Sequence, residues 1–194
     1  MRHHEPTPAP PVSYCAAVRA GLPEPHRHYH DRHYGFPLRS DDALFGRLVL
    51  EINQAGLSWT TILRKAEAFE RAYDGFRVER VAAYGDADVA RLLNDASIVR
   101  NRAKVAAAIG NARRIAELQA EHGGFLAWLS HHHPQPLEAW VQLFKRTFRF
   151  TGREITREFL VSSGWLAGAH DPDCEAYERV LAARPPWARA AAGP

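Results

Sequence analysis

The chain is organised around one stretch, Gly46-Arg47-Leu48-Val49-Leu50-Glu51-Ile52-Asn53-Gln54-Ala55-Gly56-Leu57-Ser58-Trp59. Ser40, followed by two aspartates, is typical of a helix start just before it. Apolar residues then recur at helical spacing, so that one stripe of the helix faces a core. Gly56 can end this helix and Ser58 can cap the next one. The stretch therefore predicts two helices joined by a tight turn.

Glu51 and Trp59 lie on either side of this predicted turn. Glu51 falls beside the apolar stripe, near the last turn of its helix, where the helix dipole disfavours a carboxylate. The arrangement holds a carboxylate close to a large aromatic ring and predicts a pocket. In the alternative interpretation, Glu51 reaches solvent and Trp59 is an ordinary core residue.

The composition limits the kinds of protein that the chain can be. It has 194 residues, 46% of them hydrophobic, which suffices for one domain with a good core. No apolar run is long enough to cross a membrane, and the first residues lack the apolar core of a secretion signal. We therefore expect a cytoplasmic protein. The net charge of +3 permits nucleic-acid binding without requiring it.

The pattern beyond this stretch is almost entirely helical. Residues 1–12 are rich in proline and predict a disordered arm, and residues 184–194 predict a loose C-terminal tail. Residues 13–39 are irregular, and the helical domain as a whole covers residues 13–183. The fold class is therefore all-α, a single compact domain. Helices are expected over 41–55, 58–73, 78–83, 87–94, 101–122, 125–131, 137–146, 153–165 and 172–183.

A possible metal site begins with His170 and Cys174. Their spacing places an imidazole and a thiolate on one face of a helical turn, suitable for one tetrahedral ion. Two further ligands are needed, and Cys15 and His30 are the candidates in the N-terminal segment. Two cysteines and two histidines suit a structural zinc ion with every position filled. Chance pairing is the alternative, because the chain has 11 histidines; a disulfide is also possible on cysteine count alone.

A basic hairpin connects the helices expected over 87–94 and 101–122. Backbone N–H groups at the start of the second helix could hold a DNA phosphate, and Arg100, Arg102 and Lys104 would add positive charge. The alternative is a plain solvated helix start.

The string Glu51-x-x-Gln54-Ala55-Gly56-Leu57-Ser58-Trp59 resembles the signature of the 3-methyladenine DNA glycosylase I family. The resemblance extends over most of the chain, roughly residues 15–174. It implies a helix-hairpin-helix fold and a monomeric, monofunctional enzyme that hydrolyses the N-glycosidic bond of alkylated adenine in double-stranded DNA, for base-excision repair. It also implies one structural zinc ion on the positions that match Cys15, His30, His170 and Cys174.

The same resemblance assigns roles at the predicted pocket. Glu51 would contact the damaged base as the catalytic carboxylate, and Tyr29, Tyr34 and Trp59 would bind the base. Arg100, Arg102 and Lys104 would contact DNA from the helix-hairpin-helix element. The chain departs from the family at several places: Ala17, His26 and Tyr34 stand where the family has other aromatic residues, His33 replaces a glutamate, and Ser97 replaces the hairpin glycine.

The chemistry fits these residue types. A base inside a duplex must be extruded into a pocket before an enzyme can act on it. An alkylated purine such as 3-methyladenine is cationic in DNA, so aromatic faces attract it and a carboxylate can accept its hydrogen bonds. The charged base already leaves easily, and Asp31 is the only weak candidate for activating water. Two rival hypotheses remain: a non-catalytic module that binds damaged or flipped bases, and a helical zinc protein that never contacts DNA.

Overall fold

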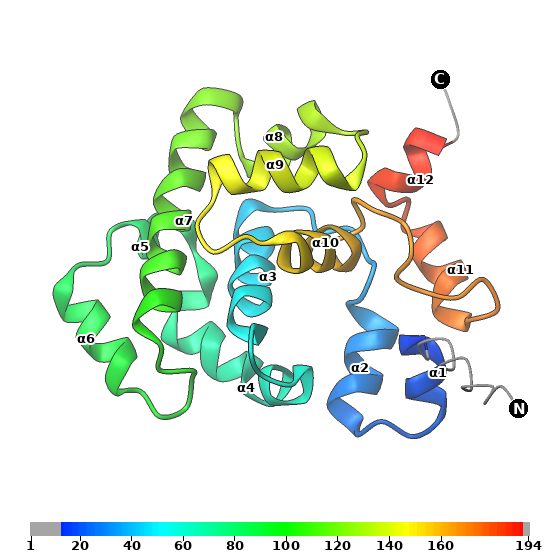
Figure 1. The fold of residues 1–194 in the computed structure, drawn as a ribbon, viewed down its shortest axis with the longest axis horizontal. Helices are drawn as coiled ribbons and strands as arrows, with labels where there is room; N and C mark the ends of the chain where they lie inside the picture. Colours follow the sequence, from blue (N-terminus) through cyan, green and yellow to red (C-terminus); the bar gives the residue numbers. More distant parts are fainter. Residues whose placement is uncertain (1–12, 192–194) are drawn as a thin grey trace, which may run out of the picture.

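The computed structural model describes residues 13–191. The proline-rich arm predicted over residues 1–12 lies outside this range. Within it every regular element is a helix, so the all-α prediction is confirmed (Figure 1). The elements are α1 (Tyr14–Arg19), α2 (Glu24–Arg32), α3 (Asp41–Gln54), α4 (Trp59–Ala72), η1 (Asp74–Phe76), α5 (Val78–Ala82), α6 (Asp86–Asn94), α7 (Arg102–His122), α8 (Phe125–His132), α9 (Leu137–Thr147), α10 (Arg153–Ser162), α11 (Glu175–Ala182) and α12 (Pro186–Ala191).

Helix α3 is the central element of the fold. It packs against α4, α7, α8 and α10, and its residues Leu44, Phe45 and Leu48 are fully buried. Ser40 caps its start by accepting a hydrogen bond from the Ala43 amide at 3.2 Å. Gly56 follows the helix with a φ of 79°, a left-handed conformation that glycine adopts without strain. The tight turn predicted between α3 and α4 is therefore present.

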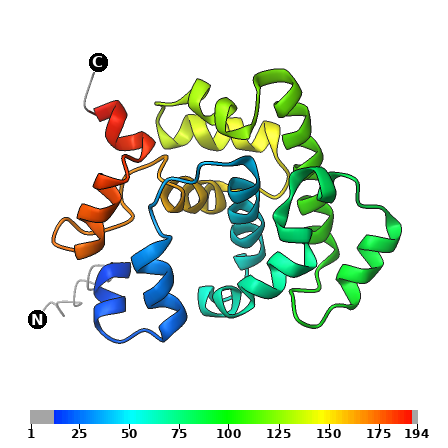
Figure 2. The ribbon, with the colours of Figure 1, turned by 180° about the vertical axis from the view of Figure 1, so that it is seen from behind.

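Helices α6 and α7 are joined by residues 95–101, so the short connection predicted between these two helices is present (Figure 2). Asp95 accepts hydrogen bonds from both the amide and the hydroxyl of Ser97, at 2.8 and 2.5 Å. Asn101 caps α7 by accepting from the Lys104 amide at 3.1 Å. Ser97 thus supports the turn through its side chain at the position where the family has glycine.

The N-terminal segment is more regular than its sequence pattern predicts. Residues 13–39, expected to be irregular, contain α1 and α2, and Ser13 caps α1 through the Ala16 amide at 3.1 Å. Helix α1 has only six residues, too few to show a helical period, and α2 is short and polar, so neither carries a repeating apolar stripe that periodicity could detect. They lie beside α11 from the other end of the sequence (Figure 1).

The C-terminal elements also differ from the expectation. The segment predicted to be a loose tail contains α12, and the Trp187 amide donates to the Gly164 carbonyl at 3.3 Å. Helix α10 ends at Ser162 rather than at Trp165, and α11 begins at Glu175 rather than at Pro172. Across residues 13–191, no helix combines the length and the apolar character needed to cross a membrane.

Candidate active site and metal centre

A cavity of about 630 Å³ opens between α1, α2, α3, α4 and α10, within the size range of small-molecule sites. The side chains predicted to form a pocket all line it: Tyr29, Tyr34, Glu51 and Trp59. Residues that the sequence did not single out for this pocket, or only as departures from the family, line it too: Tyr14, His26, Gln54, Arg157 and Glu158. The structure therefore brings the predicted carboxylate and the predicted aromatic residues to one cavity.

Glu51 is the buried acid of this cavity. Its residue is only 5% exposed, and the Ser162 hydroxyl donates to its Oε1 atom at 3.1 Å. Burial raises the pKa of Glu51 to about 7, while the positive charge of Arg47 lowers this pKa and the negative charge of Glu158 raises it further. A carboxyl group that titrates near neutrality inside a cavity is typical of a functional site.

Arg47 contacts residues of the cavity wall without lining the cavity itself, and the sequence did not predict this role. It lies one turn before Glu51 on α3 and is 8% exposed. Its Nη1 atom donates to the Tyr29 hydroxyl at 2.7 Å and to the Ser162 carbonyl at 3.2 Å. The guanidinium carbon lies 5.0 Å from the centre of the Tyr29 ring. Arg47 therefore fixes Tyr29 and α10 around Glu51.

Aromatic rings form the walls of the cavity. The Tyr29 and Trp59 rings meet edge to face at 5.2 Å, and Tyr34 lies 5.7 Å from Tyr29. Ser58 caps α4 by accepting a hydrogen bond from the Thr61 amide. This cap fixes the start of α4, whose first residue is Trp59. Tyr14 adds a further wall, edge to face with Tyr34 at 5.3 Å.

Tyr14 is held by His26, the residue noted as a departure from the family. The Tyr14 hydroxyl lies 3.0 Å from His26 Nδ1, and His26 Nε2 lies 2.7 Å from the Thr60 hydroxyl. The sequence offered no signal for Tyr14 beyond its position next to Cys15. The structure thus places the Tyr14 ring in the same pocket as His26, which stands where the family has an aromatic residue.

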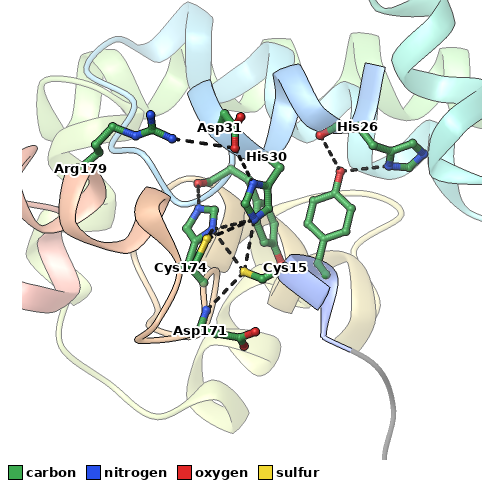
Figure 3. Close-up of polar contacts among 10 residues, drawn as sticks. Cys15, His26, His30, Asp31, Asp171, Cys174 and Arg179 are labelled. Carbon is green, nitrogen blue, oxygen red and sulfur yellow. Dashed lines mark hydrogen bonds and ion pairs between the residues drawn. The ribbon is translucent and has the colours of Figure 1, made fainter. Parts of the chain in front are cut away.

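The four predicted metal ligands lie together in one buried cluster (Figure 3). The ligand atoms of Cys15, His30, His170 and Cys174 are all within 4.8 Å of one another. Cys15 Sγ lies 3.2 Å from His30 Nε2 and 3.6 Å from His170 Nδ1, and these two nitrogens are 3.2 Å apart. Ligands bound at ordinary zinc distances in a tetrahedron are separated by roughly 3.5 Å, so this donor set fits such an ion. Both cysteines are free thiols rather than a disulfide.

The second ring nitrogen of each histidine has a partner that fixes its orientation. His30 Nδ1 lies 2.8 Å from the Asp31 carboxylate (Figure 3). His170 Nε2 lies 2.7 Å from the Tyr34 carbonyl. Such outer partners are typical of histidines that bind metals. Asp31 also faces Arg179 at 3.8 Å and does not line the cavity of Glu51. The suggestion that Asp31 activates water is therefore wrong, because its carboxylate belongs to the Cys/His cluster.

The basic residues of the hairpin divide into two kinds. Arg100 and Arg102 are exposed, as a contact to DNA requires. Lys104 is 5% exposed, and its ammonium donates to the carbonyls of Asn53 at 2.8 Å and Ala55 at 2.6 Å. The predicted phosphate contact of the Lys104 side chain is therefore wrong: this lysine satisfies carbonyls at the C-terminal end of α3.

Comparisons with known proteins agree with this fold and site. Residues 21–143 match the family model described as methyladenine glycosylase. The chain is 36% identical over 170 residues to DNA-3-methyladenine glycosylase 1 of Escherichia coli strain K12, covering 77% of this chain and 89% of the relative. It is 29% identical over 165 residues to DNA-3-methyladenine glycosylase of Haemophilus influenzae, covering 75% and 89%.

Solved structures give the same result. The structure of 3-methyladenine DNA glycosylase I from Staphylococcus aureus superposes with a TM-score of 0.74 at 30% identity, over 85% of this chain and 96% of that chain. These features together define an all-helical glycosylase. The chain belongs to the methyladenine glycosylase family.

Proposed function

We propose that this chain is a monofunctional DNA glycosylase that hydrolyses the N-glycosidic bond of 3-methyladenine in double-stranded DNA, as the first step of base-excision repair. One observation carries the proposal: Glu51 is buried in a cavity whose walls are the rings of Tyr14, Tyr29, Tyr34 and Trp59. The similar proteins are named for this activity, and one similar structure is a complex with 3-methyladenine, with a TM-score of 0.71.

The cavity suits a flipped, positively charged purine. A base extruded from the duplex can stack on Trp59 and Tyr29, whose faces attract a cation. Glu51 accepts hydrogen bonds from the base edge, with its carboxylate positioned by Ser162. Leaving the sugar removes the positive charge from the base, so departure requires little acid catalysis. The residues that line the cavity include no lysine that could form a Schiff base, which agrees with simple hydrolysis.

The Cys/His cluster is proposed to hold one zinc ion. Cys15, His30, His170 and Cys174 would fill all four coordination positions, leaving none for water or substrate. The role of the ion is therefore structural. The ion would join α1 and α2 to the segment before α11. The shape of the cavity depends on this connection, because α1 and α2 carry two of its aromatic walls.

DNA would approach the face formed by the hairpin and the mouth of the cavity. Backbone N–H groups at the start of α7 can hold a phosphate, and Arg100 and Arg102 are free to contribute charge. The enzyme would act as a monomer on chromosomal DNA, in the bacterial cytoplasm and at the nucleoid.

Release of free base from methylated duplex DNA, separated by chromatography, tests this proposal. Wild-type protein should release 3-methyladenine, and Glu51→Gln should release it at least tenfold more slowly. Glu154→Gln is a matched control, because Glu154 is exposed on α10. Wild-type protein that binds methylated DNA but releases no base would instead support a non-catalytic module that recognises damage.

A further inference from the structure

Two facing helices supply the polar groups of the cavity. Helix α3 carries Arg47 and Glu51 one turn apart, and α10 carries Glu158 and Ser162 at the same spacing. Ser162 donates to Glu51, so this face of α10 is directed at the buried carboxylate. Glu158 lines the same cavity one turn nearer the start of α10. The cavity thus contains two carboxylates that come from distant parts of the sequence.

Contacts on both of its oxygens hold Glu158 in place. The Tyr34 hydroxyl donates to Oε2 at 3.3 Å, and the neighbouring Arg157 guanidinium donates to Oε1. The Glu158 side chain is 35% exposed, so water or a ligand can reach it. A carboxylate oxygen accepts more than one hydrogen bond, which leaves Oε2 able to accept another from a bound base.

We propose that Glu158 is a second carboxylate that contacts the substrate and that, together with Glu51, selects purines carrying a formal positive charge. This inference rests on the proposed function and adds a specificity-determining residue to it. A bound cation would relieve the repulsion between the two acids, which a neutral base cannot do. The two acids are close enough to repel each other, because the negative charge of Glu158 raises the pKa of Glu51.

The guanidinium of Arg47 does not occupy the position between Glu51 and Glu158 that a cationic substrate would take. Its Nη1 atom donates to Tyr29 and to the Ser162 carbonyl, behind the wall of the cavity. Arg157 is 44% exposed and binds the other oxygen of Glu158. The position between Glu51 and Glu158 is therefore left for a ligand that donates hydrogen bonds and carries positive charge.

The first test uses methylated duplex DNA with Glu158→Gln, which keeps the shape of the side chain. The base is positively charged when it binds and loses this charge as the bond breaks, so loss of the Glu158 contact should raise KM about three- to tenfold without lowering kcat by more than twofold. Glu154→Gln, on the same helix but exposed, should match wild type.

The second test uses two small probes and needs no catalysis. 3,9-Dimethyladeninium is a permanently charged purine, and 9-methyladenine is its neutral counterpart; both can be titrated by calorimetry. Wild-type protein should prefer the cation, and Glu158→Gln should bind it about three- to tenfold more weakly while its affinity for the neutral probe changes less than twofold.

Two outcomes would overturn the inference: wild-type affinity of Glu158→Gln for the cation, or equal losses for both probes. If wild-type protein released no base from DNA yet preferred the cation through Glu158, the proposed glycosylase activity would fail and the role of Glu158 would stand.

Discussion

Tyr29 and His30 are consecutive residues of α2, yet their side chains belong to two different sites. The Tyr29 ring forms a wall of the Glu51 cavity, and its hydroxyl accepts a hydrogen bond from Arg47 at 2.7 Å. The His30 imidazole lies in the Cys/His cluster, 3.2 Å from Cys15 Sγ. The same pairing recurs on α1, where Tyr14 lines the cavity and Cys15 belongs to the cluster. The cluster therefore holds the backbone that carries two walls of the cavity.

Removing a ligand of the cluster should damage both sites. We expect one zinc ion per purified chain, and Cys174→Ala should lose it and cost several kcal/mol of stability, because metal binding contributes directly to folding. Metal analysis and thermal unfolding measure these effects. Asp173→Ala is the control, since its side chain is 75% exposed. Metal-free wild-type protein, or Cys174→Ala as stable as wild type, would refute the structural zinc ion.

Trp59→Ala should impair base release more than DNA binding. Stacking acts on the flipped base and contributes about 1–3 kcal/mol, so release should slow about ten- to a hundredfold. Affinity for undamaged duplex, which depends on phosphate contacts, should change little. Single-turnover release and fluorescence anisotropy separate the two effects, and Trp59→Phe should retain most of the activity. Equal losses in base release and DNA binding would contradict the proposal that Trp59 stacks on the flipped base.

The charge of Glu51 predicts how activity and stability depend on pH. Its pKa is raised to about 7, mainly by burial, so the carboxylate form and base release should be lost as the pH falls below 7. The sign for stability is opposite. Because the folded protein holds this proton more tightly than the unfolded chain does, Glu51 favours folding fully only below its unfolded pKa, and this contribution is lost as the pH rises through 7.

Glu51→Gln should therefore unfold at a higher temperature than wild type at pH 8, with a difference on the order of 3 kcal/mol, and match wild type more closely at pH 5. Thermal melts at both pH values measure this. An equal effect of the substitution at both pH values would mean that Glu51 is not the buried titrating group.

The three basic residues of the hairpin should respond differently to substitution. Arg100→Ala and Arg102→Ala should weaken DNA binding and reduce the slope of log affinity against log salt by about one each. Lys104→Ala should leave that slope unchanged and lower stability instead, because its ammonium satisfies two carbonyls at the end of α3. If Lys104→Ala reduced the slope of log affinity against log salt, the Lys104 side chain would contact a DNA phosphate after all.

The sequence predicted the elements with long-range periodicity and specific spacing. Helices α3, α4 and α7 carry apolar stripes and clear caps, and the all-α class follows from them. The short helices α1 and α2 were missed because the surrounding cluster and cavity, rather than an apolar stripe, bury their residues. The four cluster residues were found through motif spacing together with the family resemblance.

Arg47, Glu158 and Tyr14 were missed for another reason. As sequence, Arg47 is a polar residue in an apolar helix, and Glu158 follows an arginine as in many solvated helix faces. Only the packing of α10 against α3 brings Glu158 to the cavity of Glu51. For Lys104 the sequence predicted a functional role that the structure does not support. It is a basic residue in a DNA-binding pattern, but its side chain is buried and has a structural role.

The most direct measurement is a crystal structure of the protein soaked with free 3-methyladenine. We predict the base in the cavity, stacked on Trp59 and Tyr29, with an amino or ring nitrogen within hydrogen-bond distance of the Glu51 carboxylate. A base bound elsewhere, or an empty cavity in crystals of active protein at saturating base, would contradict this account.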